Sequence, residues 1–196
     1  MSFNISSPVE RKEISEIIKF VIQQNFNYHY DEETNISLKS DYKEIYKEEV
    51  GFLKNSRIFV FKNDDNEIQG SIRLVKWNYR DILPIQRVFK INPIEVIGNS
   101  PIRHTWHIGR FAVKKGNRSL FKKLMVKALE PVCKYKNSVV FAECDSKLLR
   151  VMNAMGIKTN QIGNSLNYLG SKTVPVVMYF DDIIDFYDKN KHLIFT

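Results

Sequence analysis

Two side chains that could do chemistry lie in an otherwise apolar stretch of the chain. His107 and Arg110 belong to "WHIGRFAV" (residues 106–113), which has the composition of a buried strand. A guanidinium is costly to bury unless it meets a carboxylate of the protein or of a ligand. Glu143, near the end of the apolar run "SVVFAEC", is an available partner. His107, Arg110 and Glu143 are therefore the candidate catalytic residues.

Alternation along a strand separates two of these residues. Because successive side chains of a strand point to opposite faces, His107 and Arg110, three positions apart, are expected on opposite faces of the sheet. A histidine in such a strand is more often a hydrogen-bonded core residue than a catalytic base. Both interpretations of His107 therefore stay open.

The segment after this strand could bind phosphate. A helix N-terminus offers unpaired N–H groups and the positive end of the helix dipole. Gly116 and Asn117 allow a tight turn, and Ser119 could cap the helix that follows. Positive charge is added by Lys114, Lys115 and Arg118. The alternative is an ordinary capped helix with solvated lysines.

The composition fits one folded domain with a basic surface. The chain has 196 residues, a formal net charge of +8 and 43% hydrophobic residues, so a single domain over residues 1–196 is expected. No apolar run reaches the roughly 20 residues that span a bilayer. The first residues carry charge where a signal peptide needs an apolar core. With only two cysteines, we expect a cytoplasmic protein with reduced thiols.

The basic charge and the absence of several known motifs limit the classes of function. The basic charge suggests an acidic partner, either nucleic acid, a membrane surface or a protein, and the alternative is a soluble protein that is simply rich in lysine. The sequence has no aromatic signature or helix-turn-helix pattern typical of nucleic-acid binding, so nucleic acid is not expected. It also has no Walker loop, no HExxH, no G-x-S-x-G and no zinc-ligand spacing.

Hydrophobic periodicity predicts a mixed α/β fold. Residues 79–104 contain three prolines and are expected to form a long loop or a short helix over the sheet. The order along the chain is two helices, an antiparallel hairpin, and then alternating strands and helices. Helices are expected over 9–25, 40–50, 119–135 and 146–157, and strands over 57–62, 68–77, 105–113, 138–144 and 174–180.

Several motifs in this order resemble one enzyme superfamily. "IQGSIRLV", "RVFKI", "WHIGRFAV", "SLFKKLMVKALEPV", "VVFAEC" and "LLRVMNAMGI" are similar to acyl-homoserine-lactone autoinducer synthases and to long-chain N-acyl amino acid synthases. Both belong to the GCN5-related N-acyltransferase (GNAT) superfamily, and the similarity covers roughly residues 55–180. It implies an α+β fold with a mostly antiparallel central sheet, helices on both faces and a splayed pair of strands.

The resemblance also implies roles for individual residues. Arg110 and Phe111 match an Arg-Phe pair of the autoinducer synthases, and Arg73 matches an arginine of an earlier strand. His107 stands where that family has a glutamate, which counts against homoserine lactone formation and against S-adenosylmethionine as substrate. The expected substrate-binding residues are Arg73, Phe89, Trp106, Phe111, Ala112 and Val113.

The donor implied by the resemblance is a thioester carried on phosphopantetheine. Ser119 and Phe121 stand at the glycine positions of the superfamily's coenzyme A loop, a change that users of acyl-carrier protein can tolerate. Lysines of the next helix offer a docking face for an acidic carrier. The expected phosphopantetheine- and carrier-binding residues are Gly116, Asn117, Arg118, Ser119, Lys122 and Lys123. No permanently bound cofactor and no metal is expected.

Together these features predict an N-acyltransferase that moves a fatty acyl group to the amine of an amino acid or similar small molecule. Acyl-carrier protein, or acyl-coenzyme A, would be the donor. Backbone amides around Phe111–Val113 would hold the oxyanion, His107 or Glu143 would accept the amine proton, and Arg73 or Arg110 would hold a carboxylate of the acceptor. The acceptor pocket would draw on residues 28–31, 79–104 and 164–175.

Two alternatives remain at this stage. One is an acetyltransferase that uses short-chain acyl-coenzyme A. The other is a protein of this fold without catalysis that binds an acidic protein or nucleic acid through its basic face.

Overall fold

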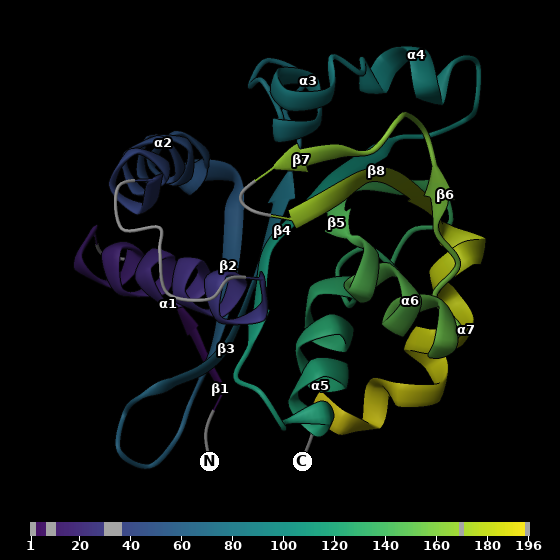
Figure 1. Cartoon of the computed structure of the whole chain (residues 1–196). Coiled ribbons are helices and arrows are strands. Elements are labelled where there is room, and N and C mark those ends of the chain that lie inside the picture. Colours follow the sequence, from purple (N-terminus) through teal and green to yellow (C-terminus); the bar gives the residue numbers. More distant parts are fainter. Residues whose placement is uncertain (1–2, 7–10, 30–36, 169–170, 195–196) are drawn as a thin grey trace.

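The computed structural model describes residues 3–6, 11–29, 37–168 and 171–194 and builds them around one sheet (Figure 1). Strand β4 and strand β5 run parallel, and the other neighbouring strands are antiparallel. A short strand, β7 (Leu166–Tyr168), also pairs with β8. The order across the eight-stranded sheet is β1 (Phe3–Ser6), β2 (Ser56–Lys62), β3 (Ile68–Lys76), β4 (His104–Val113), β5 (Ser138–Asp145), β8 (Ser171–Tyr179) and β6 (Asn160–Gln161).

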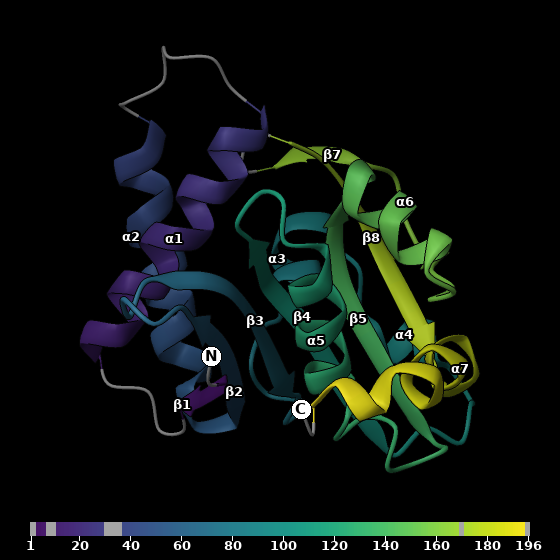
Figure 2. The same ribbon diagram turned by 90° about the horizontal axis from the view of Figure 1, so that it is seen from below.

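Helices cover both faces of this sheet (Figure 1). One face carries α5 (Arg118–Leu129), α6 (Ser146–Ala154) and α7 (Phe180–Asn190). The other carries α1 (Arg11–His29) and α2 (Ser37–Phe52), with the short helices α3 (Pro84–Phe89) and α4 (Pro93–Ile97) further along. Figure 2 shows α5 in front of β4 and β5, with α1 and α2 grouped away from α6 and α7. Two 3-10 turns complete the elements, η1 (Leu53–Asn55) and η2 (Lys191–Ile194).

The apolar core is continuous on one face and divided on the other. Under α5, α6 and α7 a single cluster joins residues such as Ile72, Leu74 and Leu124. On the opposite face one cluster lies under α1 and α2, and a separate one lies under α3 around Phe141. Between these two clusters the interior holds polar side chains, among them Arg73 and Glu49, and these mark the candidate site.

The sequence-based fold prediction is confirmed, with differences in individual elements. Residues 79–104 contain α3 and α4, and each begins with a proline, whose fixed φ suits the first position of a helix. Helix α5 ends at Leu129 rather than near residue 135, because Pro131 has no N–H to continue the helix. The short strands β1, β6 and β7 and the helix α7 were not predicted. In the part of the chain described here, no helix is long and apolar enough to cross a membrane.

Close packing of α5 on β3 depends on Gly70. A Cβ at this position would lie 2.7 Å from Leu124 Cδ1 and 2.9 Å from Leu120 Cδ2, and both leucines are buried. We predict that Gly70→Val lowers the free energy of unfolding by about 1–3 kcal/mol, because the core has no room for the added methyl groups. Urea unfolding followed by circular dichroism measures the change.

The matched control is Gly51→Ala in α2, where a Cβ meets nothing within 4 Å. That change should leave the stability unchanged or raise it by about 0.5–1 kcal/mol, since alanine favours the helix. A Gly70→Val protein as stable as the wild type would contradict the close packing of α5 on β3.

Candidate active site

A β-bulge in β4 shapes the centre of the site. Arg73 pairs with Gly109 and Ser71 with Ala112, so two residues of β4, Arg110 and Phe111, lie opposite one residue of β3. Arg110 has a φ of 54°, and its carbonyl accepts a hydrogen bond of 3.1 Å from Ser71 Oγ. The bulge turns Arg110 toward the polar group that contains His107. The expectation that the two residues face opposite sides was therefore wrong, because strict alternation fails at a bulge.

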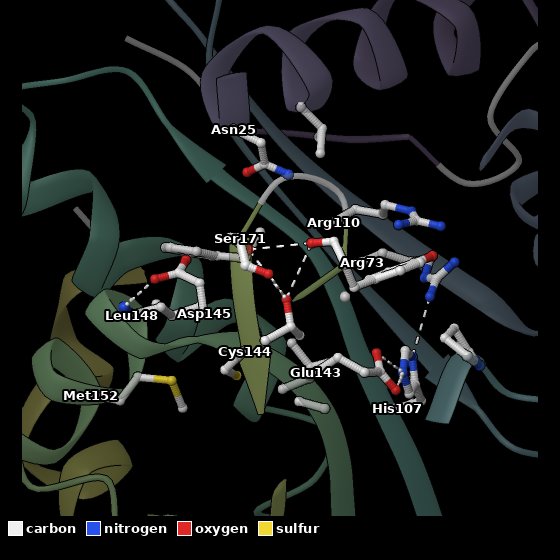
Figure 3. A pocket seen from close by; sticks show the side chains of 18 of the residues that line it. Asn25, Arg73, His107, Arg110, Glu143, Cys144, Asp145, Leu148, Met152 and Ser171 are labelled. Atoms are coloured by element: carbon white, nitrogen blue, oxygen red, sulfur yellow. Dashed lines mark hydrogen bonds and ion pairs between the residues drawn. The ribbon is translucent and has the colours of Figure 1, made fainter. Parts of the chain in front are cut away.

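Strands β4 and β5 separate at the same place. Their pairing ends at Ile108 and Ala142, while β4 continues along β3 and β5 continues along β8. A pocket with a volume of about 100 Å³ lies at this separation (Figure 3). Its polar lining comprises Asn25, Arg73, His107, Arg110, Glu143, Asp145, Tyr168, Ser171 and Thr173.

Two carboxylates at the end of α2 meet the two arginines of the pocket. Glu49 accepts hydrogen bonds from Arg73 Nη1 and, at 2.7 Å, from Arg110 Nε. Glu48 Oε1 lies 2.5 Å from Arg110 Nη2 and 3.4 Å from Arg73 Nη1. Glu48 also contacts Arg87 of α3, whose side chain is 42% exposed. The two guanidiniums that line the pocket, those of Arg73 and Arg110, are thus matched by two carboxylates of the protein, and Arg87 adds a third, partly exposed guanidinium to the network.

His107 links this network to Glu143. Its Nδ1 lies 3.2 Å from Arg73 Nη2, and its Nε2 lies 2.9 Å from Glu143 Oε2. Because a guanidinium only donates hydrogen bonds, Nδ1 must be the acceptor. The neutral ring therefore carries its proton on Nε2 and donates it to the Glu143 carboxylate. His107 is fully buried, whereas the Glu143 side chain is 9% exposed and borders the pocket.

Gly109 leaves space for this arrangement. A Cβ at Gly109 would lie 2.9 Å from Arg73 Nη2 and 3.2 Å from His107 Cε1. Any larger residue would push the guanidinium and the ring from the positions in which they hydrogen-bond to each other. Glycine is therefore needed here for close approach rather than for an unusual φ.

The surroundings fix the protonation of several groups. Burial alone would raise the pKa of the Glu48 carboxyl, but the guanidiniums of Arg110, Arg73 and Arg87 outweigh burial and hold it below its ordinary value. Burial and then the carboxylates of Glu143 and Asp145 raise the pKa of the Cys144 thiol, so Cys144 is not a thiolate nucleophile at neutral pH. Burial also raises the pKa of Tyr168, which keeps this phenol a hydrogen-bond donor.

The predicted substrate-binding residues divide into two groups. Phe111 lines the pocket, and with Ala112 and Val113 it also lines an adjacent apolar groove that reaches Phe121 of α5 and Leu148 of α6. Phe111 and Phe121 pack edge to face, with their centroids 4.8 Å apart.

Trp106 and Phe89 do not line the pocket. Trp106 alternates with His107 and so points into the core beneath α5, and Phe89 packs against the cluster under α3.

The predicted phosphopantetheine site also needs one correction. The cap of α5 is Asn117, whose Oδ1 accepts a hydrogen bond of 3.1 Å from the Leu120 N–H, so Ser119 lies inside the first turn and does not cap. Gly116 has a φ of 94°, as a tight turn requires. Lys122 is exposed and Lys123 is partly buried, while the side chain of Arg118 lies outside the described part of the structure.

A second hollow opens beside the apolar groove. Lys114 and Lys115, which follow β4, line it together with Lys147 of α6 and with Gln23 and Gln24 of α1. Glu67, just before β3, also lines this hollow and lies 3.6 Å from Lys114 Nζ, so part of the positive charge at this end of β4 is paired within the protein.

Several residues of the site were missed in the sequence analysis. Glu49 follows Ile45 by four positions, which places it on the buried stripe of α2, and this was the available signal. Tyr168, Ser171 and Thr173 fall in the predicted acceptor segment 164–175, and Pro84 falls in the predicted segment 79–104. The side chains of residues 28–31 lie outside the described residues. Among the described residues, no group of three or more His, Cys, Asp or Glu is placed to hold a metal ion.

The lowered pKa of Glu48 makes the stability depend on pH. A carboxyl with a lower pKa in the folded than in the unfolded state stabilises fully above its ordinary value of 4.5, and this contribution is lost as the pH falls below it. We predict that Glu48→Gln lowers the free energy of unfolding at pH 7 by about 3 kcal/mol. Between pH 4.5 and 3 the free energy of unfolding of Glu48→Gln should also fall less steeply with decreasing pH than that of the wild type.

Glu44→Gln, on the exposed side of the same helix, is the control and should match the wild type in both respects. Urea unfolding at a series of pH values provides the measurement. An unchanged slope in Glu48→Gln would show that this carboxylate does not carry the acid sensitivity.

Comparison with known proteins shows the fold. No model of a known protein family matches the chain, and no curated protein matches its sequence. FeeM, an N-acyl amino acid synthase from uncultured soil microbes, is 14% identical with a TM-score of 0.57, covering 92% of this chain and 96% of FeeM. The AHL synthase LasI is 15% identical with a TM-score of 0.58, covering 95% and 93%.

A third similar structure is an acetyltransferase of the GNAT family from Staphylococcus aureus Mu50. It is 14% identical with a TM-score of 0.55, and the match covers 91% of this chain and 99% of the acetyltransferase. The separated β4–β5 pair and the helices on both faces agree with these likenesses. The chain thus has a GNAT-like fold that resembles autoinducer synthases and N-acyl amino acid synthases.

Proposed function

We propose that this protein is an N-acyltransferase that moves an acyl group from a thioester donor to the amine of a small molecule. The observation that carries the proposal is the position of the Glu143 carboxylate. It follows directly after the last residue of β5 that pairs with β4, borders the pocket and is oriented by His107. A carboxylate held at the point where two strands separate is suited to take a proton from an attacking amine.

In this proposal Glu143 is the proton acceptor and His107 is a positioning residue. Both ring nitrogens of His107 are already hydrogen-bonded, and the ring has no exposed surface. The ring therefore acts on the substrate only through Glu143. Arg73 in turn holds the histidine in the tautomer that donates to the carboxylate.

The donor would enter between the separated ends of β4 and β5. Beyond Ile108 the edge of β4 has no β5 partner, so an extended amide arm such as phosphopantetheine could pair with the open edge. The apolar groove beside it suits methylene groups of the donor. The lysines of the neighbouring hollow and of the start of α5 would favour a negatively charged carrier or phosphate.

The chemical steps balance without a further reactant. The amine nitrogen attacks the thioester carbonyl carbon, a C–N bond forms, and Glu143 accepts a proton from the nitrogen. The tetrahedral oxyanion accepts hydrogen bonds from backbone N–H groups around Phe111–Val113. Its collapse breaks the C–S bond, and the departing thiolate takes the proton from Glu143, which regenerates the carboxylate.

A direct assay with variants of Glu143 tests this proposal. Purified protein is incubated with acyl-carrier-protein thioesters or with acyl-coenzyme A in the presence of pooled amines, and mass spectrometry follows donor and product. We expect the wild type to form an amide. In Glu143→Gln, kcat should fall by a factor of at least about 100, because the proton acceptor is lost. His107→Gln, which keeps a donor toward Glu143, should retain more activity than His107→Leu.

A comparison of kcat with KM separates positioning from a merely structural role of His107. In His107→Leu kcat should fall while KM for donor and acceptor barely changes, because the Glu143 carboxylate is still present but is no longer held in place by the imidazole. A Glu143→Gln variant with unchanged kcat would contradict the role of Glu143. A folded wild type that consumes neither kind of donor would contradict the proposed function, and use of acetyl-coenzyme A alone would favour the short-chain alternative.

Charge reversal at the start of α5 tests the carrier. We propose acyl-carrier protein as the donor's carrier, and expect the double variant Lys122→Glu/Lys123→Glu to raise KM for carrier-bound donor about tenfold, since the carrier is acidic. KM for the same acyl group on free pantetheine should barely change. The double variant Lys136→Glu/Lys189→Glu, at two exposed lysines away from the start of α5, is the matched control for net charge. Equal effects on both donors would argue against docking at this helix.

A further inference from the structure

The acceptor side of the pocket contains two cations, and both are already neutralised by the protein. Among the described residues that line the pocket, the positively charged ones are Arg73 and Arg110. Two carboxylates from α2, those of Glu48 and Glu49, lie against them. A substrate carboxylate would therefore compete with groups that the chain itself supplies.

Arg73 is out of reach of a substrate. Its side chain is 1% exposed, and its guanidinium carbon lies 5.0 Å from the centre of the Phe52 ring. Nη1 donates to Glu49, and Nη2 donates to His107. Nε has no hydrogen-bond partner, but it is buried as well. No nitrogen of Arg73 is thus open to a ligand in the pocket.

Arg110 is held nearly as completely. Its Nε donates to Glu49 at 2.7 Å and its Nη2 to Glu48 at 2.5 Å, while the side chain is 10% exposed. Nη1 could still donate a hydrogen bond, but the charge of the guanidinium is matched by two carboxylates. The third arginine of the network, Arg87, is partly exposed, pairs with Glu48 and does not line the pocket.

The carboxylates of the pocket itself have no such compensation. Glu143 accepts a hydrogen bond from the neutral His107 ring, and in the described part of the chain it forms no ion pair with a lysine or arginine. Asp145 caps α6 by accepting from the N–H groups of Lys147 and Leu148, at 2.7 and 2.9 Å. A buried carboxylate without a cation favours a ligand that brings one.

We propose that the acceptor is an amine with no carboxylate on the carbon that bears the nitrogen, bound as its ammonium form by Glu143. This inference rests on the proposed acyl transfer and specifies its acceptor. In an α-amino acid the carboxylate lies one carbon from the amine. It would be brought beside Glu143, where both guanidiniums of the pocket are already paired with protein carboxylates, and like charges at such distances repel strongly in a partly buried site. An ammonium releases one further proton to solvent before its nitrogen attacks.

Matched sets of three compounds test the proposal. Each set contains an amino acid, its amide and the corresponding decarboxylated amine: tyrosine, tyrosinamide and tyramine, or leucine, leucinamide and 3-methylbutylamine. Binding to the wild-type protein is measured by titration calorimetry, and acyl transfer by mass spectrometry. We expect the amine and the amide of at least one set to bind at least tenfold more tightly than the amino acid. The amide has nearly the size of the amino acid but carries no carboxylate, so its tighter binding would show that the charge of the amino acid, and not its size, weakens binding.

A variant provides a second, independent measurement. Glu48→Gln removes one compensating charge from Arg110, so the preference for amine over amino acid should fall several-fold, whereas Glu44→Gln should keep the wild-type preference. The comparison on the wild-type protein stands even if Glu48→Gln folds poorly.

Equal or tighter binding of the amino acids, or no binding of any compound, would overturn the proposal. Acyl transfer that prefers amino acids would overturn the inference and leave the proposed function standing. If the amines and amides bind more tightly as expected but no amine is acylated, the binding preference stands and the proposed function is contradicted.

Discussion

Two buried guanidinium groups impose the constraint on which the rest of the site depends. Arg73 and Arg110 lie where β4 leaves β5, and each needs a carboxylate because an unpaired buried charge is costly. Glu48 and Glu49 supply these carboxylates from the last turns of α2. Such ion pairs add little stability compared with well-packed apolar side chains, but they are demanding in geometry. They fix α2 over β3 and β4, and they place the Phe52 ring over Arg73.

The same network stabilises a strained backbone. A non-glycine residue with positive φ costs on the order of 1 kcal/mol, and Arg110 adopts it at the bulge of β4. The two carboxylates bound to its side chain and the Ser71 hydroxyl bound to its carbonyl hold it there. Because the bulge follows the last β4–β5 pair, a single irregularity marks the place where the strands part and where charge is gathered.

The sequence allowed the fold to be predicted further than the site. Regular apolar periods in the α5 and β5 segments identified elements of the fold, and the apolar strand around Arg110 predicted a carboxylate partner for it. Glu143 was the partner that the sequence offered, but Arg110 pairs with Glu48 and Glu49, and Glu143 meets His107 instead. The sequence could not show that Arg110 turns to the side of His107, because the bulge depends on pairing with β3. Nor could it show that Glu48 and Glu49 form ion pairs with the arginines, since α2 is distant from β3 and β4 in the sequence and only helix packing brings them together. Asn117 and Ser119 are both good capping residues, and only the observed start of α5 distinguishes them.

The charge of the whole chain and the charge of the site act over different distances. The net charge of +8 creates a field around the molecule, and in physiological salt it is screened beyond about 8 Å. It can therefore attract an anionic carrier to the lysines at the start of α5 and beside β4, where solvent is present. Within the pocket the arginines are matched by Glu48 and Glu49, so the overall positive charge does not reach a bound acceptor. There the proposed acceptor would meet the Glu143 carboxylate, so a protein with a positively charged surface can still favour a cation in this pocket.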